Sequence, residues 1–398
     1  MPPIEITICL SRDQNSTHLD AVLESFNAAR SASSGARVTV IPWDAYKDEL
    51  TAIAIYGKGP DISQVGAPLV NDLVVMNALR PFTSREIANF GGQSTFHATA
   101  WQSSRRVHEG HIWAIPWLAD PRAILYWRDF LSQAGVQANN AFQSFDQMER
   151  TLQRLQDSVV ETPWVLPIGD RLQALQAACS WIWGAGGDFV SADNRTPFFH
   201  QPDAIEGLKR YFGLYRFMPK EGQPLDGPHA FQLFFDRKVA VTTGNLGQTL
   251  ELLNKLPPDL RSQIGVALPP GAPLVGSSSL VVWKHAFNDQ EAVELVKFLL
   301  TKDAQVQYCQ RVGYLPVRTD ALLEPPYATD PIFRGFAQAL QRGRIFPLIK
   351  LGGLLEDKLA TILSTIWTDL IADQKINLDT VLSKEFNPLV RRFDQWTG

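Results

Sequence analysis

The first part of the chain alternates between two hydrophobic periodicities. Strand-length apolar runs occupy Ile4–Leu10, Ala36–Pro42 and 60–65, and apolar residues recur at helical spacing over 19–29 and Tyr46–Tyr56. This β-α-β-α-β order predicts a parallel, open sheet with helices on both of its faces. In sheets of this kind, ligands bind beyond the carboxyl ends of the strands, near a switch in strand order.

The remainder of the chain continues this α/β pattern. Two strand-like pieces fill 110–127, and the length of that segment allows it to cross between two lobes; 313–318 is a second candidate crossing. Further strands are predicted over 238–243, 264–268 and 279–283. Helices are predicted over 128–134, 145–157, 171–183, 203–217, 231–235, 289–301, 304–311, 331–342, 355–372 and 378–396.

Composition narrows the class of protein. The chain has 398 residues, 45% hydrophobic and 20% charged, as in globular proteins of two or three domains. Its net charge of −4 gives no basic field, so we expect no nucleic-acid partner. No apolar run reaches the roughly 18 residues that a membrane span needs. The first strand follows Met1 almost directly, without the basic and apolar regions of a leader, so either the protein is cytoplasmic or a leader has been removed.

The residue types that bind metals predict no metal site and no cofactor. Cys9, Cys179 and Cys309 are widely spaced and odd in number, so we interpret them as small buried residues rather than disulfide or zinc partners. His108 and His111 lie three residues apart, but no third ligand is evident.

The 11 Trp residues are an anomaly, because several adjoin Gly, Pro or Asp and are candidates for stacking on a ligand.

Several short motifs follow one another in a recognisable order. They are GPDI at 59–62, IWAIPWLADPRAILYWRDFLSQAG at 112–135, FFDRKVAVTTG at 234–244, and a long segment at 268–318 that begins LPPGAPLVGSSSLVVW and ends GYLPVR. In this order the chain resembles the extracellular solute-binding proteins of ABC transporters, in the carbohydrate-binding group that includes the maltose- and glycerol-phosphate-binding proteins. It departs from that group at three places. Tyr126-Trp127 stands where the group often has Tyr-Asn, and Gly276-Ser277 where it often has Gly-Gly. The frequent Gly-Ser-Trp is also absent at 244–246.

The resemblance implies a two-lobed α/β fold of the periplasmic-binding-protein type, in which each lobe is an open sheet flanked by helices and hinge crossings join the lobes. The first lobe is expected over 1–117 plus 268–318, and the second over 119–267 plus 319–398. The implied function is that of the substrate-binding subunit of an ABC importer, which captures a sugar or sugar derivative in the cleft between lobes by hinge closure. The implied protein is a monomer, not an enzyme, that works with permease subunits. It is expected to be periplasmic or extracytoplasmic and membrane-anchored.

Two other functions stay open at this point. A glycoside-active enzyme is one, because spacing alone does not decide whether two carboxylates are paired for hydrolysis. The nucleophile elbow, Walker loop, dinucleotide fingerprint and H-E-x-x-H motifs are nevertheless absent from the sequence. A sensory binding module that uses the same fold with a different partner is the other alternative.

Candidate ligand-binding residues follow from what a sugar requires. Its ring face suits an aromatic plane, and its paired hydroxyls suit carboxylate, amide or guanidinium groups. Residues that follow the first three strands, at the expected mouth of the cleft, are Arg12, Asp13, Gln14, Trp43, Asp44, Gly66 and Ala67. The resemblance adds residues of the crossings and of later strand ends, namely Trp117, Asp120, Arg122, Asp188, Asn245, Ser277, Ser278, Tyr314 and Arg318.

Three of these assignments carry alternatives. Trp181 and Trp183 cannot both face the ligand from one helix, because residues two apart lie on different faces; we expect Trp183 at the site and Trp181 in the core. Arg122 has Asp120 as an alternative partner. Arg318 has an alternative role as the structural partner of a hinge carboxylate.

Overall fold

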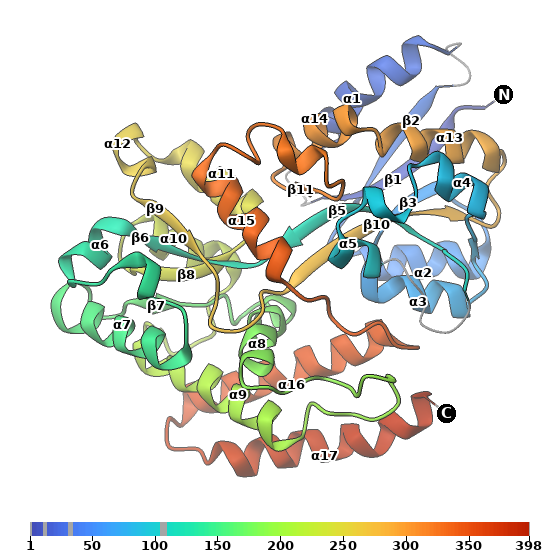
Figure 1. Ribbon diagram of the computed structural model, residues 1–398. Coiled ribbons are helices and arrows are strands. Elements are labelled where there is room, and N and C mark those ends of the chain that lie inside the picture. The colour runs from blue at the N-terminus through green and yellow to red at the C-terminus, as the bar shows by residue number, and fades with distance from the viewer. Residues whose placement is uncertain (1, 11–13, 31–34, 104–109, 398) are drawn as a thin grey trace. The chain divides into compact units, whose positions relative to one another are not determined.

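The computed structural model describes residues 2–10, 14–30, 35–103 and 110–397, which form two compact units. Unit 1 comprises Met1–Asp120, Val275–Phe333 and Leu348–Gly352. Unit 2 comprises Pro121–Leu274, Arg334–Pro347 and Gly353–Gly398. Both units are therefore built from segments that lie far apart in the sequence, as Figure 1 shows by colour.

A seven-stranded sheet forms the centre of unit 1. Its strands are β1 (Ile4–Leu10), β2 (Ala36–Pro42), β3 (Ile62–Gly66), β4 (Leu79–Arg80), β5 (Ile115–Pro121), β10 (Val275–Trp283) and β11 (Leu315–Pro316). The order is β11-β5-β10-β3-β1-β2, with β4 also paired to β10. β1 runs parallel to β2 and β3, as the sequence pattern predicts, whereas β10 is antiparallel to β3. Five of the seven residues of β1 in a row are buried, as expected for a strand covered on both faces.

Helices cover both faces of this sheet. In Figure 1, α2 and α3 lie on one face and α1, α13 and α14 on the other. The helices of unit 1 are α1 (Thr17–Ala28), α2 (Tyr46–Tyr56), α3 (Ala67–Val75), α4 (Ser84–Asn89), α5 (Ala98–Gln102), α13 (Asp289–Leu299) and α14 (Lys302–Val312), and α15 (Pro331–Arg342) begins there. Short 3₁₀ turns at Gln93–Thr95 and Ala321–Leu323 complete the unit.

Unit 2 contains a four-stranded sheet of order β7-β8-β6-β9. The strands are β6 (Ala123–Trp127), β7 (Trp164–Val165), β8 (Val241–Gly244) and β9 (Ile264–Ala267). β8 is parallel to β7, and β6 is antiparallel to both β8 and β9. This pairing brings the carboxyl ends of β7, β8 and β9 and the amino end of β6 to the same edge of the sheet.

The helices of unit 2 build a second layer that is rich in aromatic contacts. They are α6 (Arg128–Gln133), α7 (Phe145–Ser158), α8 (Arg171–Gly184), α9 (Pro202–Gly213), α10 (Gly227–Phe235), α11 (Leu246–Lys255), α12 (Pro258–Arg261), the rest of α15, α16 (Gly352–Ala372) and α17 (Leu378–Thr397), with 3₁₀ turns at Ala138–Asn140 and Leu214–Phe217. Trp367 of α16 packs against Phe212 of α9 with ring centroids 4.9 Å apart. Phe386 of α17 packs against Phe199, also with close ring centroids.

The tryptophans are mainly core residues. Of the ten whose side chains the structure describes, eight are buried, so most of the Trp surplus is explained by packing rather than by stacking on a ligand. The three cysteines are likewise free and buried, as predicted.

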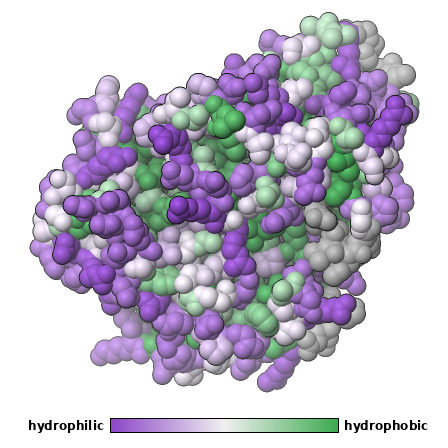
Figure 2. Space-filling model, in the orientation of Figure 1, coloured by the Kyte–Doolittle hydropathy of each residue, from purple (hydrophilic) through white to green (hydrophobic). Residues whose placement is uncertain are grey.

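The face shown in Figure 2 is mostly hydrophilic, and hydrophobic residues reach it only as separated patches.

The division into units differs from the expected lobes at several places. The segment 313–318 is not a crossing, because β11 pairs with β5 inside unit 1. Thr319 also stays in unit 1, where its N–H donates to the Thr95 carbonyl at 2.9 Å. The chain leaves unit 1 again only within α15, after Phe333. Residues 268–274 belong to unit 2 rather than to the first lobe, because Pro273 accepts a hydrogen bond from the backbone of Arg344.

Candidate functional site

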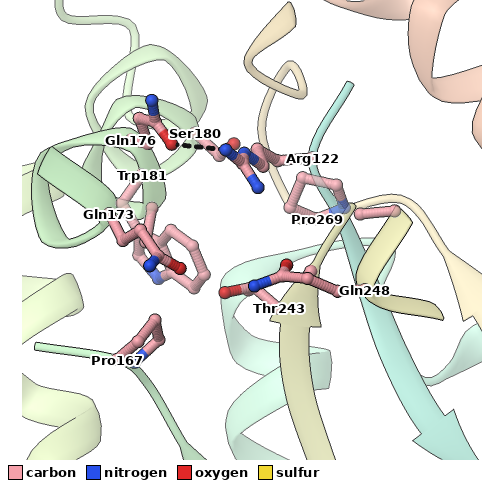
Figure 3. Close-up of a pocket in the computed structure, with 12 residues that line it drawn as sticks. Arg122, Pro167, Gln173, Gln176, Ser180, Trp181, Thr243, Gln248 and Pro269 are labelled. Atoms are coloured by element: carbon pink, nitrogen blue, oxygen red, sulfur yellow. Dashed lines mark hydrogen bonds between the residues drawn. The ribbon is translucent and has the colours of Figure 1, made fainter. Parts of the chain in front are cut away.

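A pocket lies entirely within unit 2. Figure 3 shows its side chains converging from a helix on one side and from strand ends on the other. Its lining residues are Arg122, Ala123, Pro167, Gln173, Gln176, Ala177, Ser180, Trp181, Thr243, Gly244, Gln248 and Pro269.

One wall of the pocket is a single face of α8. Its members lie at positions i, i+3, i+4, i+7 and i+8, which a helix brings onto one side; they are Gln173, Gln176, Ala177, Ser180 and Trp181. The helix begins at Asp170, whose carboxylate accepts hydrogen bonds from the backbone N–H groups of Leu172 and Gln173 at 3.0 and 3.1 Å. This N-cap fixes the start of the helix and hence the height of Gln173 in the wall.

The opposite wall is the sheet edge where strand ends meet. Thr243 and Gly244 end β8, Pro167 follows β7, and Pro269 follows β9. Arg122 stands immediately before β6, which begins at this edge because it is antiparallel to β8. The pocket therefore occupies the position that ligands favour in α/β sheets, beyond the carboxyl ends of strands.

The two walls approach each other closely beside the pocket. A Cβ atom at Gly271 would lie 1.9 Å from the carbonyl oxygen of Ser180 on α8. Only glycine fits there, which explains the Gly of the Pro269-Pro270-Gly271 turn. The contact anchors the loop after β9 against α8, so the loop and the helix form a fixed frame for the pocket.

Amide and guanidinium groups supply the polar surface of the pocket. The Arg122 Nη2 atom donates to Gln176 Oε1 at 2.8 Å, the bond drawn in Figure 3, and its backbone N–H donates to the Leu274 carbonyl at 2.8 Å. Gln173 Nε2 donates to the Asp170 carboxylate at 2.8 Å. These bonds hold planar polar groups in set directions, which suits recognition of paired oxygen atoms on a ligand.

Gln248 reaches the pocket from the first turn of α11. Asn245 is the N-cap of that helix: its side chain accepts the Gln248 N–H at 2.9 Å, and Gln248 Oε1 accepts the Asn245 N–H at 3.2 Å. This reciprocal capping box fixes the side chain of Gln248 as well as the helix end. Figure 3 shows Gln248 beside Thr243 on the strand side of the pocket.

Trp181 forms an apolar part of the helical wall. Its ring packs near Trp164 and Tyr211, with centroid distances of 6.2 and 5.6 Å. Tyr211 donates its hydroxyl to the Ala174 carbonyl at 2.8 Å, and burial raises the pKa of this hydroxyl. Burial also raises the pKa of the Cys179 thiol on the same helix. Because both groups stay protonated near neutral pH, neither adds charge to this wall.

The match to a family decides the class of protein. Residues 21–335 match the model of the bacterial extracellular solute-binding proteins, which is more than half of the chain. The chain belongs to this family. Membership places this solute-binding protein outside the cytoplasm, and none of its described helices is both long and apolar enough to span a membrane.

Individual relatives are distant in sequence but similar in fold. A binding protein of Brucella abortus (strain 2308) is 24% identical over 324 residues, covering 78% of this chain and 75% of its own. The GacH receptor of Streptomyces glaucescens superimposes with a TM-score of 0.82 at 18% identity, covering 99% of both chains. The sugar-binding protein MalE of Xanthomonas citri gives the same TM-score and identity, covering 99% of this chain and 98% of its own. The predicted α/β fold class is thereby confirmed.

Among the residues predicted to bind ligand, Arg122 is the one that lines the pocket of this solute-binding protein. Arg12 and Asp13 lie outside the described residues. Gln14 and Asp44 are exposed. Trp43 is half-buried and packs edge-on against Tyr46, with ring centroids 5.2 Å apart.

The remaining candidates of unit 1 are held mainly in structural contacts. Trp117 is a correction: it is 1% exposed, and its ring stacks on Tyr308 with centroids 4.9 Å apart, so its faces are used in the core. Arg318 has a structural partner, because its guanidinium donates to both Asp320 carboxylate oxygens at 2.8 and 2.7 Å, although Asp320 lies within unit 1 and not at a hinge. Ser278 is buried, and its hydroxyl accepts a hydrogen bond from Gln64 at 3.0 Å.

Five further candidates of unit 1 lie on or beside its strands and helices. Gly66 ends β3 opposite Ser278, and Ala67 is the buried first residue of α3. Asp120 and Ser277 are half-buried, on β5 and β10 respectively. Tyr314 follows α14, also half-buried, and its N–H donates to the Cys309 carbonyl at 3.1 Å.

In unit 2, both Trp181 and Trp183 are buried, and Trp181 is 1% exposed, in agreement with the core position expected for it. Trp183 is bound away from the pocket, because its Nε1 donates to Asp188 at 3.1 Å and Arg344 lies over its ring at 4.8 Å. Asp188 is itself occupied by these partners, with its other oxygen bound to Arg344 at 2.5 Å. Trp181 lines the pocket instead. Asn245 acts on the site indirectly, as the helix cap that holds Gln248.

Sequence reasoning missed the glutamines. Gln173, Gln176 and Gln248 were in no motif, although the i, i+3 spacing of the first two on a predicted helix was a readable signal. Their place in the pocket depends on which face α8 turns toward the sheet. Among the described residues, no group of three His, Cys, Asp or Glu is arranged to hold a metal ion.

Proposed function

We propose that this protein is the sugar-capturing subunit of an ABC importer and that the pocket of unit 2 is the centre of its ligand site. The single observation that carries the proposal is the set of planar amide and guanidinium groups converging at strand ends, beside apolar Trp181 and Pro residues. A sugar presents many oxygens and an apolar ring face, and such a wall complements both.

The ligands of the structural neighbours support a sugar rather than another polar solute. The GacH receptor is described in complex with acarbose, and the Xanthomonas protein is described as sugar-binding. Both share the whole fold of this chain, although their identity to it is only 18%. We extend their ligand class, but no individual sugar, to this chain.

The ligand is bound without being converted. Hydrolysis of a glycoside needs an acid and a base or nucleophile beside the scissile bond. Among the twelve described residues that line the pocket, none is Asp or Glu. Incubation with the best-binding sugar for a day, followed by mass spectrometry, should return that sugar intact. A product formed in proportion to protein would establish an enzyme instead.

Other parts of the proposal concern partners and location. The protein works as a monomer that delivers its ligand to the permease subunits of the importer, and it is attached to the membrane. The strand-end residues of unit 1, such as Asp44 and Asp120, are proposed to supply further ligand contacts. Size-exclusion chromatography with light scattering tests the monomer, and fractionation of the source cells tests the attachment.

A thermal-shift screen against sugars and polyols tests the function. A ligand at about 100 times its dissociation constant adds roughly 2.7 kcal/mol to the free energy of unfolding. We expect at least one sugar to raise the melting temperature of the wild-type protein in a concentration-dependent way. If amino acids or peptides raise it and no sugar does, the solute class proposed here is wrong.

A further inference from the structure

The two carboxylate oxygens of Asp170 have different partners. Oδ1 accepts the backbone N–H groups of Leu172 and Gln173 at 3.0 and 3.1 Å, which caps α8. Oδ2 accepts a third hydrogen bond, from the Nε2 atom of the Gln173 side chain at 2.8 Å. A helix cap needs only the first oxygen. The second oxygen acts on a side chain that lines the pocket.

This second contact decides which end of the Gln173 amide is presented to the pocket. A carboxylate oxygen only accepts hydrogen bonds, so the amide nitrogen must turn toward Asp170. A flipped amide would place two acceptor oxygens against each other. The amide oxygen is therefore presented as an acceptor, and Figure 3 shows Gln173 reaching from α8 toward Thr243 and Gln248 across the pocket.

A distant part of the chain holds this arrangement in place. The Gly169 N–H donates to the Leu225 carbonyl at 2.7 Å, which ties the start of α8 to the loop before α10. Gly227, the first residue of α10, packs beside the amide, because a Cβ atom there would lie 3.0 Å from Gln173 Nε2. The amide nitrogen is thus enclosed by the carboxylate and by α10, and its orientation is set by the fold.

We propose that Asp170 is a positioning residue that determines the specificity of the pocket, because it fixes Gln173 as a hydrogen-bond acceptor. The proposal rests on the proposed function and deepens it. The hydroxyls of Ser180 and Thr243 in the same pocket can rotate to donate or to accept, whereas Gln173 has one polarity. The sugar group that meets Gln173 has to donate, as a hydroxyl does, and a group that only accepts is disfavoured there.

The variant Asp170→Asn reverses this polarity and keeps the cap. Asn caps helices as well as Asp does, and the two backbone N–H groups hold its side-chain oxygen in the place of Oδ1. Its NH₂ group then replaces Oδ2 and is a donor, so the Gln173 amide has to flip and present its own NH₂ group to the pocket. Asp330→Asn is the matched control, because Asp330 caps α15 through the same two kinds of contact, at 2.8 and 3.2 Å, outside the pocket.

Hydrogen exchange of the Gln173 side chain tests the orientation in the protein without sugar. The NH₂ signals are assigned in amide NMR spectra by their absence from Gln173→Met. We expect these protons to exchange at least tenfold faster in Asp170→Asn than in the wild type, because they lose the carboxylate and face the pocket. Asp330→Asn should exchange at the wild-type rate. Equal exchange in Asp170→Asn and the wild type would overturn the proposal.

Deoxyfluoro sugars test the consequence for binding, because fluorine in place of a hydroxyl cannot donate. Glucose, galactose and the series of deoxyfluoro analogues of each are titrated calorimetrically. For a sugar that the wild type binds, we expect one analogue to bind at least tenfold more weakly than its parent. In Asp170→Asn this same difference should shrink to less than threefold, and in Asp330→Asn it should persist.

The outcomes separate this proposal from the proposed function. If Asp170→Asn weakens the parent sugar and every analogue by the same factor, Asp170 only supports the structure; the proposal is then overturned and the sugar-binding function stands. The same holds if the wild type binds every analogue as tightly as its parent. If no sugar of this panel or of the wider screen binds, the proposed function fails, and the exchange measurement decides the orientation of Gln173.

Discussion

Trp117 shows how a residue on a predicted crossing serves the core instead. Its ring is stacked on Tyr308 at an interplanar angle of 10°, and Gln305 Nε2 donates to its carbonyl at 3.0 Å. Trp117→Phe should therefore lower the free energy of unfolding by about 1–3 kcal/mol, since it leaves a partly unfilled space in a packed core. Affinity for sugar should stay within twofold of wild type.

Denaturant unfolding and calorimetry on the same preparations check this prediction. The exposed-surface substitution Gln153→Ala serves as a control for stability, because Gln153 lies on the solvent side of α7. If Trp117→Phe kept the stability of the wild type but lost its affinity for sugar, Trp117 would be a ligand-binding residue after all.

The pair of Arg318 and Asp320 gives a pH dependence with a definite sign. The hydrogen bonds from the Arg318 guanidinium lower the pKa of the Asp320 carboxyl. A carboxyl with a lowered folded-state pKa stabilises the fold above its unfolded pKa of about 3.9, and that contribution is lost as the pH falls through the folded-state value.

We expect the melting temperature of the wild type to drop on acidification below about pH 4, with part of that drop owed to this pair. Asp320→Asn should be less stable at pH 7 and should show a shallower drop. Melting curves of both proteins between pH 3 and pH 7 provide the measurement. Parallel curves for the two proteins would show that this pair contributes nothing to acid sensitivity.

At the scale of elements, the first turn of α11 contributes both to the stability of the fold and to the pocket. Asn245 caps the helix and holds Gln248, which lines the pocket. Asn245→Ala should cost about 1 kcal/mol of unfolding free energy, as is usual for loss of an N-cap. It should also weaken sugar binding, because the Gln248 side chain loses the reciprocal arrangement that orients it. Asn245→Asp, which retains a capping oxygen, should keep the stability of the wild type; equal stability of the Ala and Asp variants would argue against the cap.

The long elements could be predicted from the sequence, and the short ones could not. The hydrophobic periodicity places α2 at its observed bounds and β1 and β2 likewise, because each repeats its pattern over at least seven residues. β4, β7 and β11 have only two residues each, and their pairing depends on strands that are distant in the sequence. The crossing predicted at 313–318 was misplaced for the same reason. An extended apolar segment has the same local sequence pattern whether it pairs with β5 or leaves the unit.

The site was less predictable than the fold for a related reason. The predicted first crossing drew attention to Arg122, which lines the pocket, but α8 is apolar on most of its faces. Its rotation about its own axis, and with it the choice of Trp181 over Trp183, is set by packing against Trp164 and Tyr211. Packing of this kind involves residues from three separate elements and leaves no local signal.

At the scale of the whole molecule, the chain passes between its two units several times, at Asp120–Pro121, Leu274–Val275 and within α15 among others. We predict that these connections act as hinges when a ligand is bound, as in other two-domain binding proteins. Small-angle scattering should show a smaller radius of gyration with saturating sugar than without it. An unchanged radius, measured where calorimetry proves saturation, would rule out closure as the mode of capture.

The most direct test of the central claim is a calorimetric titration of the wild type and of Arg122→Gln with the best sugar from the thermal-shift screen. Arg122 lines the pocket, and the loss of a charged hydrogen bond costs about 1.5–3 kcal/mol, which corresponds to roughly a 10- to 150-fold weaker affinity. The account predicts one sugar bound per wild-type chain and at least tenfold weaker binding by a folded Arg122→Gln variant. Equal affinity of the two proteins would place the site elsewhere, and the absence of heat with every sugar would contradict the assignment of this protein as a sugar-binding subunit.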